Sequence, residues 1–202
     1  MSQAETNSVT FEWQNSLVTT PAANLPDLGS LLCLADHETP GTDAAILRIA
    51  TELAAPAARP VLLLDLGQPA NRFWNRLSRS GRLEPRPSPA PAAPNSAVLQ
   101  FYRLRAANLM VSFVTPDPAY FGDDAWQLRK TGALARLHEL FSRIVLVPPA
   151  IAQSGQAWWL AGAADATLLL LRKGKTEAAA AQRLRDQVID AGGWPVGSVL
   201  VS

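Results

Sequence analysis

The sequence predicts an α/β domain with one doubly wound, mainly parallel sheet and helices on both faces. Short, continuously apolar runs alternate along the chain with longer segments of helical periodicity. Such runs are typical of strands that are buried on both faces, and these occur mainly in parallel sheets. The 202 residues are enough for one sizeable core, and 48% hydrophobic and 17% charged residues are typical of a packed globular protein. We therefore expect residues 29–202 to form the domain and the polar residues 1–28 to form a largely irregular arm.

Composition excludes several classes of function. The formal net charge is only +1, so there is no electrostatic argument for nucleic acid as a partner. The single cysteine and the two histidines are too few for a disulfide or for a metal site built from these residues. The N-terminus has no signal-peptide pattern, and no apolar run approaches the roughly 20 residues that span a bilayer. We expect a cytoplasmic protein that does not itself insert into a membrane and that a partner can recruit to the inner membrane.

The first strand and helix follow from their apolar patterns. Residues 31–35 are a continuous apolar run and predict a buried strand. Residues 44–53 carry apolar side chains on one side and predict a helix, with Thr42 or Asp43 as its N-cap.

The second strand and helix come next. Residues 61–64 predict a buried strand that ends at Asp65. Pro69 is expected to begin a helix, since proline is favoured at the first helical position, and the side chains that share one face of this helix are Phe73, Trp74 and Leu77.

The second half of the chain continues the alternation after a loop. Residues 84–94 are dense in Pro and Ala, which excludes regular structure and predicts that loop. The last helix is expected to be capped by Thr176 and closed by Gly192. The remaining predicted strands are 98–102, 109–114, 144–147, 166–171 and 196–201, and the remaining helices are 124–141, 157–163 and 176–191.

The candidate site lies where the first strand meets its helix. In parallel sheets, ligands sit beyond the carboxyl ends of the strands, which here are Ala35, Asp65 and Val147. A strand, a glycine-containing turn and a helix are the layout of a phosphate-binding loop. Such a loop needs a lysine for the phosphates and a hydroxyl for Mg²⁺.

The residues of this turn fit a phosphate loop poorly. Gly41 is a clear match, but Thr42 stands where the lysine belongs and Asp43 where the hydroxyl belongs. An aspartate at a helix N-terminus is itself an anion and would repel phosphate. On the residues alone, an ordinary turn between strand and helix that Asp43 caps is the better interpretation, because helix caps are far commoner than phosphate loops.

The other two strand ends carry weaker signals. Asp65 is suited to hold a metal-bound water or to cap the next turn, and its position does not decide between these roles. A strand of the Walker B type would end in an aspartate that positions Mg²⁺. The corresponding residues are Leu146 and Val147, which have no metal-binding capacity.

These segments together resemble a known family. The chain is similar, from about Leu31 to Val201, to the cytoplasmic kinase domains of bacterial tyrosine kinases of capsule and exopolysaccharide synthesis, which belong to the ParA/MinD-type P-loop group. The resemblance implies a P-loop NTPase-like fold. Four segments carry the resemblance, and they are residues 62–67, 144–150, 163–176 and 196–200.

The departures from the family pattern indicate a lost activity. The family's Gly-Lys-Ser/Thr is Gly41-Thr42-Asp43 here, and its Walker B aspartate falls on Leu146. No tyrosine-rich tail follows the last strand. We therefore predict a pseudokinase or pseudo-ATPase with no catalytic residue, metal or cofactor, whose vestigial nucleotide-site positions are Thr39, Gly41, Thr42, Asp43 and Asp65.

The resemblance also implies a setting for a non-catalytic binding protein. It implies a regulatory or scaffolding role in the synthesis or export of an exopolysaccharide or cellulose. The expected partner is an inner-membrane polysaccharide co-polymerase, a synthase subunit or an active ATPase relative. Formation of a homo-oligomer is also compatible with the sequence. The aromatic side chains that we consider for contact with a partner are Phe73, Trp74, Trp158 and Trp159.

Two alternatives remain. In the first, the chain is a divergent nucleotide-binding ATPase or switch of the ParA/MinD type. Thr39, Gly41, Thr42 and Asp65 would line its pocket, and Lys173 or Lys175 would supply charge. In the second, it is a positioning regulator of the MinD type, but no amphipathic membrane helix follows the last strand.

Overall fold

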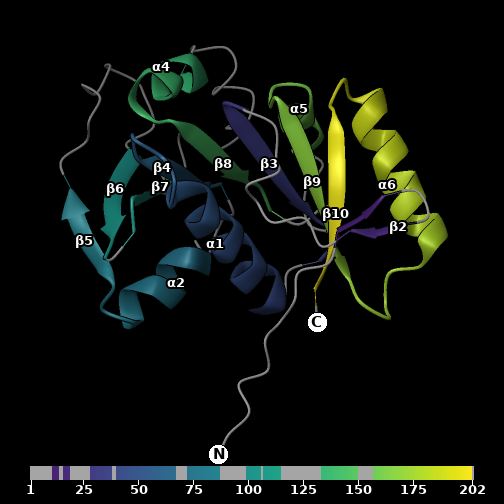
Figure 1. The fold of residues 1–202 in the computed structure, drawn as a ribbon, viewed down its shortest axis with the longest axis horizontal. Helices are drawn as coiled ribbons and strands as arrows, with labels where there is room; N and C mark the ends of the chain where they lie inside the picture. Colours follow the sequence, from purple (N-terminus) through teal and green to yellow (C-terminus); the bar gives the residue numbers. More distant parts are fainter. Residues whose placement is uncertain are drawn as a thin grey trace, which may run out of the picture.

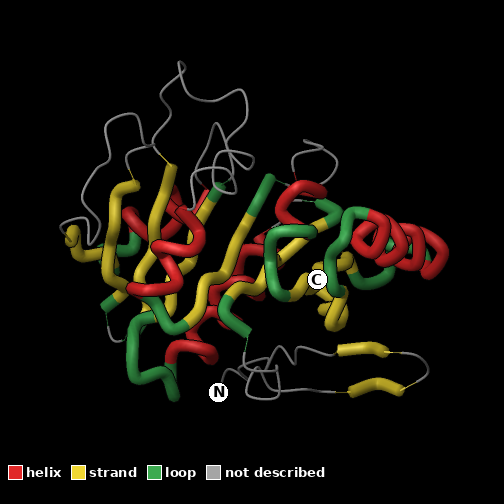
Figure 2. The backbone as a smooth tube through the Cα atoms, turned by 90° about the horizontal axis from the view of Figure 1, so that it is seen from above, coloured by secondary structure: helices red, strands yellow, loops and turns green. Residues whose placement is uncertain are grey.

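The computed structural model contains one sheet of ten strands in the part of the chain that it describes. The described residues are 11–13, 16–18, 28–37, 40–66, 72–86, 99–105, 107–114, 133–149 and 157–201. The order of the strands across the sheet is β2-β1-β10-β9-β3-β8-β4-β7-β6-β5. Figure 1 shows these elements, and Figure 2 shows helices on both sides of the strands.

Six neighbouring strands form the parallel centre of the sheet. The register pairs Leu32 of β3 with Leu146 of β8 on one side and with Thr167 of β9 on the other. In spatial order the six strands are β10 (Pro195–Val201), β9 (Ala166–Arg172), β3 (Ser30–Ala35), β8 (Arg143–Val147), β4 (Val61–Asp65) and β7 (Leu109–Val114).

Antiparallel strands complete both edges. One edge holds β6 (Leu99–Leu104) and β5 (Leu83–Arg86). The other edge holds β1 (Phe11–Trp13) and β2 (Ser16–Val18), where Phe11 of β1 pairs with Val199 of β10.

Alternate side chains of the central strands build two separate cores. Leu31, Cys33 and Ala35 of β3 belong to a cluster with the helices α1 (Pro40–Ala54) and α2 (Arg72–Arg79). Leu32 and Leu34 belong to a second cluster, on the opposite face, with α4 (Ala133–Leu140), α5 (Ala157–Ala161) and α6 (Ala178–Asp190). Burial on both faces explains the continuous apolar runs. The predicted α/β class, with a mainly parallel sheet between two helical layers, is confirmed.

Several boundaries differ from those expected. The pairing of β1 with β2 and β10 was not anticipated, because three-residue strands leave no readable alternation in the sequence. The first three residues of the expected Pro-rich loop, 84–86, belong to the edge strand β5, where Pro85 is tolerated because an edge residue need not donate to a neighbour. The first residues of the expected helices at Pro69 and 124–141 lie outside the described residues, as do residues 87–98.

The ends of α6 correct one predicted cap and confirm the other. The N-cap position is Glu177 rather than Thr176, and no side chain caps the helix there, because the Thr176 hydroxyl is bonded elsewhere. Gly192 follows the C-cap residue Ala191 with a φ of +80°, a value that glycine adopts without strain. The helix therefore ends where the sequence predicts.

The strand order brings the three predicted strand ends together. Because β3, β8 and β4 are parallel neighbours, their carboxyl ends lie side by side at one end of the central strands. The turn after β3, the residue Asp65 and the end of β8 therefore lie at this same end of the sheet. None of the described helices is long and apolar enough to cross a membrane.

Candidate functional site

The turn between β3 and α1 is closed by one of its own hydroxyl groups. Gly41 and Thr42 lie in the first turn of α1, and Thr42 is fully buried. The Thr42 hydroxyl donates a hydrogen bond to the carbonyl oxygen of His37, 3.3 Å away. This bond joins the start of the turn to the start of the helix. Thr39 lies outside the described residues.

The charge of this turn opposes phosphate binding. Residues 36–44 contain no lysine or arginine, and they contain the three acidic residues Asp36, Glu38 and Asp43. Asp43 lies in the first turn of α1, where a carboxylate interacts favourably with the positive end of the helix dipole. A phosphate group would compete with this carboxylate for the same end of the helix and would be repelled by it.

Asp65 supports the start of the second helix. It is the last residue of β4 and is fully buried. One carboxylate oxygen accepts a hydrogen bond from the backbone N–H of Phe73, at 3.3 Å, in the first turn of α2. The contact supplies an acceptor for an N–H that the helix itself leaves unsatisfied. Of the two roles that the sequence leaves open, this geometry fits the structural one.

The end of β8 offers only apolar side chains. Leu146 and Val147 are both fully buried, and Leu146 packs in the core beneath α4 and α5. Nowhere among the described residues do three or more His, Cys, Asp or Glu side chains gather in a way that would hold a metal ion.

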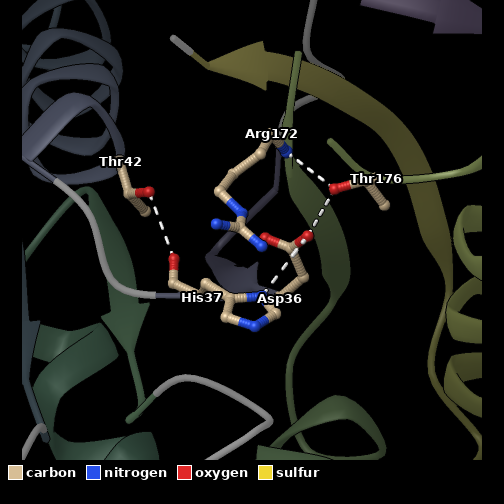
Figure 3. A network of polar contacts seen from close by, with 5 residues as sticks. All are labelled: Asp36, His37, Thr42, Arg172 and Thr176. Atoms are coloured by element: carbon tan, nitrogen blue, oxygen red, sulfur yellow. Dashed lines mark hydrogen bonds and ion pairs between the residues drawn. The ribbon is translucent and has the colours of Figure 1, made fainter. Parts of the chain in front are cut away.

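A polar network joins the carboxyl ends of β3 and β9 (Figure 3). The Thr176 hydroxyl accepts a hydrogen bond from the backbone N–H of Arg172, at 2.9 Å, and donates one to the carboxylate of Asp36. The backbone N–H of Asp36 donates to the carbonyl of Leu170. The turn that precedes α6 is thereby tied to the turn that precedes α1.

Two charged groups of this network remain incompletely satisfied. One carboxylate oxygen of Asp36 and the Nε of Arg172 are buried and have no hydrogen-bond partner within the described part of the chain. The Asp36 side chain is 10% exposed, and the exposed imidazole of His37 lies 3.7 Å from its other oxygen. In Figure 3 the guanidinium of Arg172 extends toward Asp36 and His37. The carboxylate reduces the attraction that this cation would exert on a phosphate.

Sequence reasoning missed this network. Its one signal was the position of Asp36, directly after a strand that is buried on both faces. The role of Thr176 depends on a partner 140 positions away, which no local pattern reveals.

Lys173 and Lys175 lie in the turn after β9, at the same end of the parallel strands as the network. Both are exposed. The backbone N–H of Lys173 donates to the carbonyl of Val201, and that of Lys175 donates to the carbonyl of Arg172. These bonds fix the backbone of the turn, and the lysine side chains remain on the surface.

The four aromatic side chains proposed for partner contact have different surroundings. Phe73 is fully buried in the core beneath α1 and α2, which removes it from any partner surface. Trp158 is half-buried and packs against the second core, whereas Trp159 is 59% exposed. Trp74 belongs to α2, and its side chain lies outside what the structure describes. Trp159 is therefore the clearest surface candidate of the four.

Comparison with solved structures identifies close neighbours of this fold. The kinase domain of VpsO shares 18% identity, with a TM-score of 0.68 over 89% of this chain and 87% of that chain. The kinase domain of the Escherichia coli tyrosine kinase ETK shares 15% identity, with a TM-score of 0.62 over 89% and 69% of the two chains. The BceF tyrosine kinase domain shares 15% identity, with a TM-score of 0.60 over 85% and 68%.

Two comparisons of the sequence alone identify no family and no relative for this chain. No protein-family model matches the chain. No curated protein matches it. The three structural neighbours are kinase domains, two of them of tyrosine kinases, and this chain has the fold of those domains.

Proposed function

We propose that this chain is a pseudokinase or pseudo-ATPase that acts as a non-catalytic binding protein. The observation that carries the proposal is the turn between β3 and α1. It has three acidic residues and no lysine or arginine in residues 36–44, at the place where the fold would hold a nucleotide's phosphates. Phosphoryl transfer depends on charge compensation by a lysine and by Mg²⁺, so losing both should remove most of the catalysis.

The contacts around the turn support the same conclusion. The Thr42 hydroxyl contacts the His37 carbonyl, and the Asp65 carboxylate contacts the start of α2. In a working site, the residue at the position of Thr42 would be the lysine that binds the phosphates, and a carboxylate at a strand end would serve the metal and its waters. Here each has a role in holding the fold together, and β8 ends in Leu146 and Val147.

The setting that we propose is exopolysaccharide or cellulose biosynthesis. It follows from the resemblance of residues 31–201 to bacterial tyrosine kinases of that process, together with the shared fold. The partner would be an inner-membrane co-polymerase, a synthase subunit or an active ATPase relative. The chain would regulate or position that partner without hydrolysing ATP.

One observation favours an alternative, a divergent nucleotide switch. The Arg172 guanidinium lies beside the turn after β3. Lys173 and Lys175 are exposed in the turn after β9, at the same end of the parallel strands. These cations would have to replace the missing lysine of the loop. The carboxylates of Asp36 and Asp43 oppose this arrangement.

The test combines an assay of the purified chain with an assay in cells. We expect no ATP hydrolysis and no autophosphorylation above a no-protein control. In the host bacterium, deleting the gene should lower extracellular polysaccharide. A chain with Lys173→Ala and Lys175→Ala should restore the output fully, since neither lysine is needed for a binding role. ATP turnover by the pure chain, together with failure of the double variant to restore the polymer, would support the nucleotide switch instead.

A further inference from the structure

Positive charge is concentrated in one stretch of the chain. Residues 72–105 contain seven arginines and one glutamate, whereas the whole chain contains 18 basic and 17 acidic residues. This stretch therefore has a net charge of +6, and the rest of the chain has a net charge of −5. The formal net charge of +1 thus conceals a strong asymmetry, of the kind that indicates contact with a polyanion or with an anionic surface.

The fold gathers this stretch at one edge of the sheet. It contains α2, the turn after it, β5 and β6, and β5 is the last strand in the order across the sheet. Figure 1 shows these elements together on one side of the molecule, with β10 and α6 on the other side. Five arginine side chains of this stretch are described, and all five are exposed. We call them the arginine edge, and they are Arg79, Arg82, Arg86, Arg103 and Arg105.

Three of these arginines surround a single carboxylate. Glu84 of β5 and Arg103 of β6 are directly opposite in the antiparallel pair, so their side chains share one face of the sheet. One carboxylate oxygen of Glu84 lies 3.0 Å from the Nε of Arg105, and the other lies 3.5 Å from a guanidinium nitrogen of Arg86. Three guanidinium groups offer far more N–H donors than one carboxylate can accept. This face therefore keeps an excess of positive charge and of hydrogen-bond donors.

Protection of an exposed edge strand does not explain this distribution. Charged side chains on an edge strand discourage its pairing with another chain, and residues of either sign serve that purpose. The edge strand β5 also contains Pro85, which already removes one N–H donor from it. An edge that needed only protection would carry a mixture of acidic and basic residues. The excess of one sign therefore indicates a partner of the opposite charge.

We infer that the arginine edge binds the surface of a membrane that contains anionic phospholipids. Guanidinium groups bind phosphate groups through paired N–H donors, and several arginines near an anionic surface add their attractions. A flat surface meets only one side of the molecule, and the net charge of −5 on the rest of the chain would turn the arginine edge toward it. The contact would be electrostatic and peripheral, since the described part of this edge exposes no large apolar side chain.

Nucleic acid fits this surface less well. A long polyanion extends beyond one edge and would meet the negative charge of the rest of the chain. Single strands also bind through aromatic side chains on which bases stack, and the large apolar side chains that are exposed in the described structure all lie outside residues 72–105. The inference goes beyond the proposed function and does not depend on it, because ATP turnover by the chain would leave the arginine edge unchanged.

The experiment measures co-sedimentation of the purified chain with vesicles. Vesicles of phosphatidylglycerol and phosphatidylcholine are compared with vesicles of phosphatidylcholine alone. We expect binding only to the anionic vesicles, and we expect it to weaken steeply as salt rises, because the arginines are exposed. Fluorescent DNA and a glutamate-rich peptide, each measured by anisotropy and as a competitor of the vesicles, test other polyanions.

Variants of the chain locate the surface. Arg103→Gln with Arg105→Gln should weaken vesicle binding about tenfold or more, because each basic residue at an anionic surface contributes about fivefold. Arg103→Lys with Arg105→Lys keeps the charge and should keep most of the binding. Arg183→Gln with Lys175→Gln removes the same charge from exposed positions near the other edge of the sheet, and it should change binding by less than about twofold.

Glu84→Gln gives a prediction of the opposite sign. It removes the only acidic side chain of residues 72–105, so vesicle binding should become about two- to fivefold stronger. Glu177→Gln, at an exposed position before α6, is the matched control and should leave binding unchanged. Circular dichroism checks that each variant is folded. If the double Arg→Gln variant does not fold, Glu84→Gln decides the question.

Three results would overturn the inference. In the first, the chain binds neither kind of vesicle or binds both kinds equally. In the second, all variants bind the anionic vesicles alike. In the third, DNA or the acidic peptide outcompetes the anionic vesicles and its binding requires Arg103 and Arg105, which would assign the arginine edge to that polyanion instead.

Discussion

At the scale of single residues, the polar groups at the carboxyl ends of the parallel strands serve the fold. Thr42 bonds to a carbonyl of its own turn, Asp65 supports α2, and Thr176 connects Asp36 to Arg172. The sequence identified Asp65 as a candidate but left two roles open, and it placed Thr176 at a helix cap. The Thr176 contact joins residues 140 positions apart, and the Asp65 contact depends on how α2 is placed against the end of β4, so no local pattern contains either outcome.

The Thr176 contact gives the first prediction. Thr176→Val removes the donor to Asp36 and the acceptor of the Arg172 N–H, so it should lower the free energy of unfolding by about 1–3 kcal/mol. Urea denaturation measures the change. The matched control is Thr51→Val, which removes an exposed bond to the carbonyl of Leu47 and should change stability by less than about 0.5 kcal/mol. Equal effects of the two substitutions would contradict a structural role for the network.

Asp65 gives the second prediction. Asp65→Ala leaves the start of α2 without its carboxylate acceptor and should destabilise the chain by about 1–2 kcal/mol, as for a lost helix cap. Thermal and urea unfolding measure the loss. Asp190→Ala, at an exposed position near the end of α6, is the control and should stay within about 0.5 kcal/mol of the parent. If Asp65→Ala were neutral, the carboxylate would have no part in holding the fold.

At the scale of elements, strong apolar runs were predictable and short edge strands were not. The run at 109–114 matches β7 at both ends, and the runs at 31–35 and 144–147 each match a buried strand to within one residue. The strands β1, β2 and β5 have three or four residues and lie at the edges of the sheet. They are held by pairing with neighbours rather than by burial of both faces, so their sequences carry little periodic signal.

The junction of α5 and α6 gives a prediction at this scale. Gly162→Ala would place a methyl group 2.5 Å from the carbonyl oxygen of Ala191, and a backbone atom cannot move aside as a flexible side chain can. The substitution should lower the free energy of unfolding by about 1–3 kcal/mol. Gln187→Ala, on the exposed side of α6, serves as the control and should be nearly neutral. A stable Gly162→Ala protein would mean that the two segments are less closely packed.

At the scale of the whole molecule, the two ends of the parallel sheet have different properties. The carboxyl end carries the turn whose charge opposes phosphate, and the amino ends of β9 and β10 follow segments with the exposed side chains of Trp159 and Trp194. The fold class was predictable because it depends on many apolar residues acting together. The exposed aromatic side chains were predictable only in part. Trp159 was a candidate, whereas Trp194 was not, because a single tryptophan before a strand carries no periodic signal of its exposure.

The most direct test of the account is calorimetry of the purified chain with ATP and ADP in the presence of Mg²⁺. A thermal-shift scan accompanies it, because a ligand at a hundred times its dissociation constant stabilises a protein by about 2.7 kcal/mol. The account predicts no heat of binding and no shift. Micromolar binding that is lost in Arg172→Gln or in Lys173→Ala with Lys175→Ala would contradict it and would make the chain a nucleotide switch.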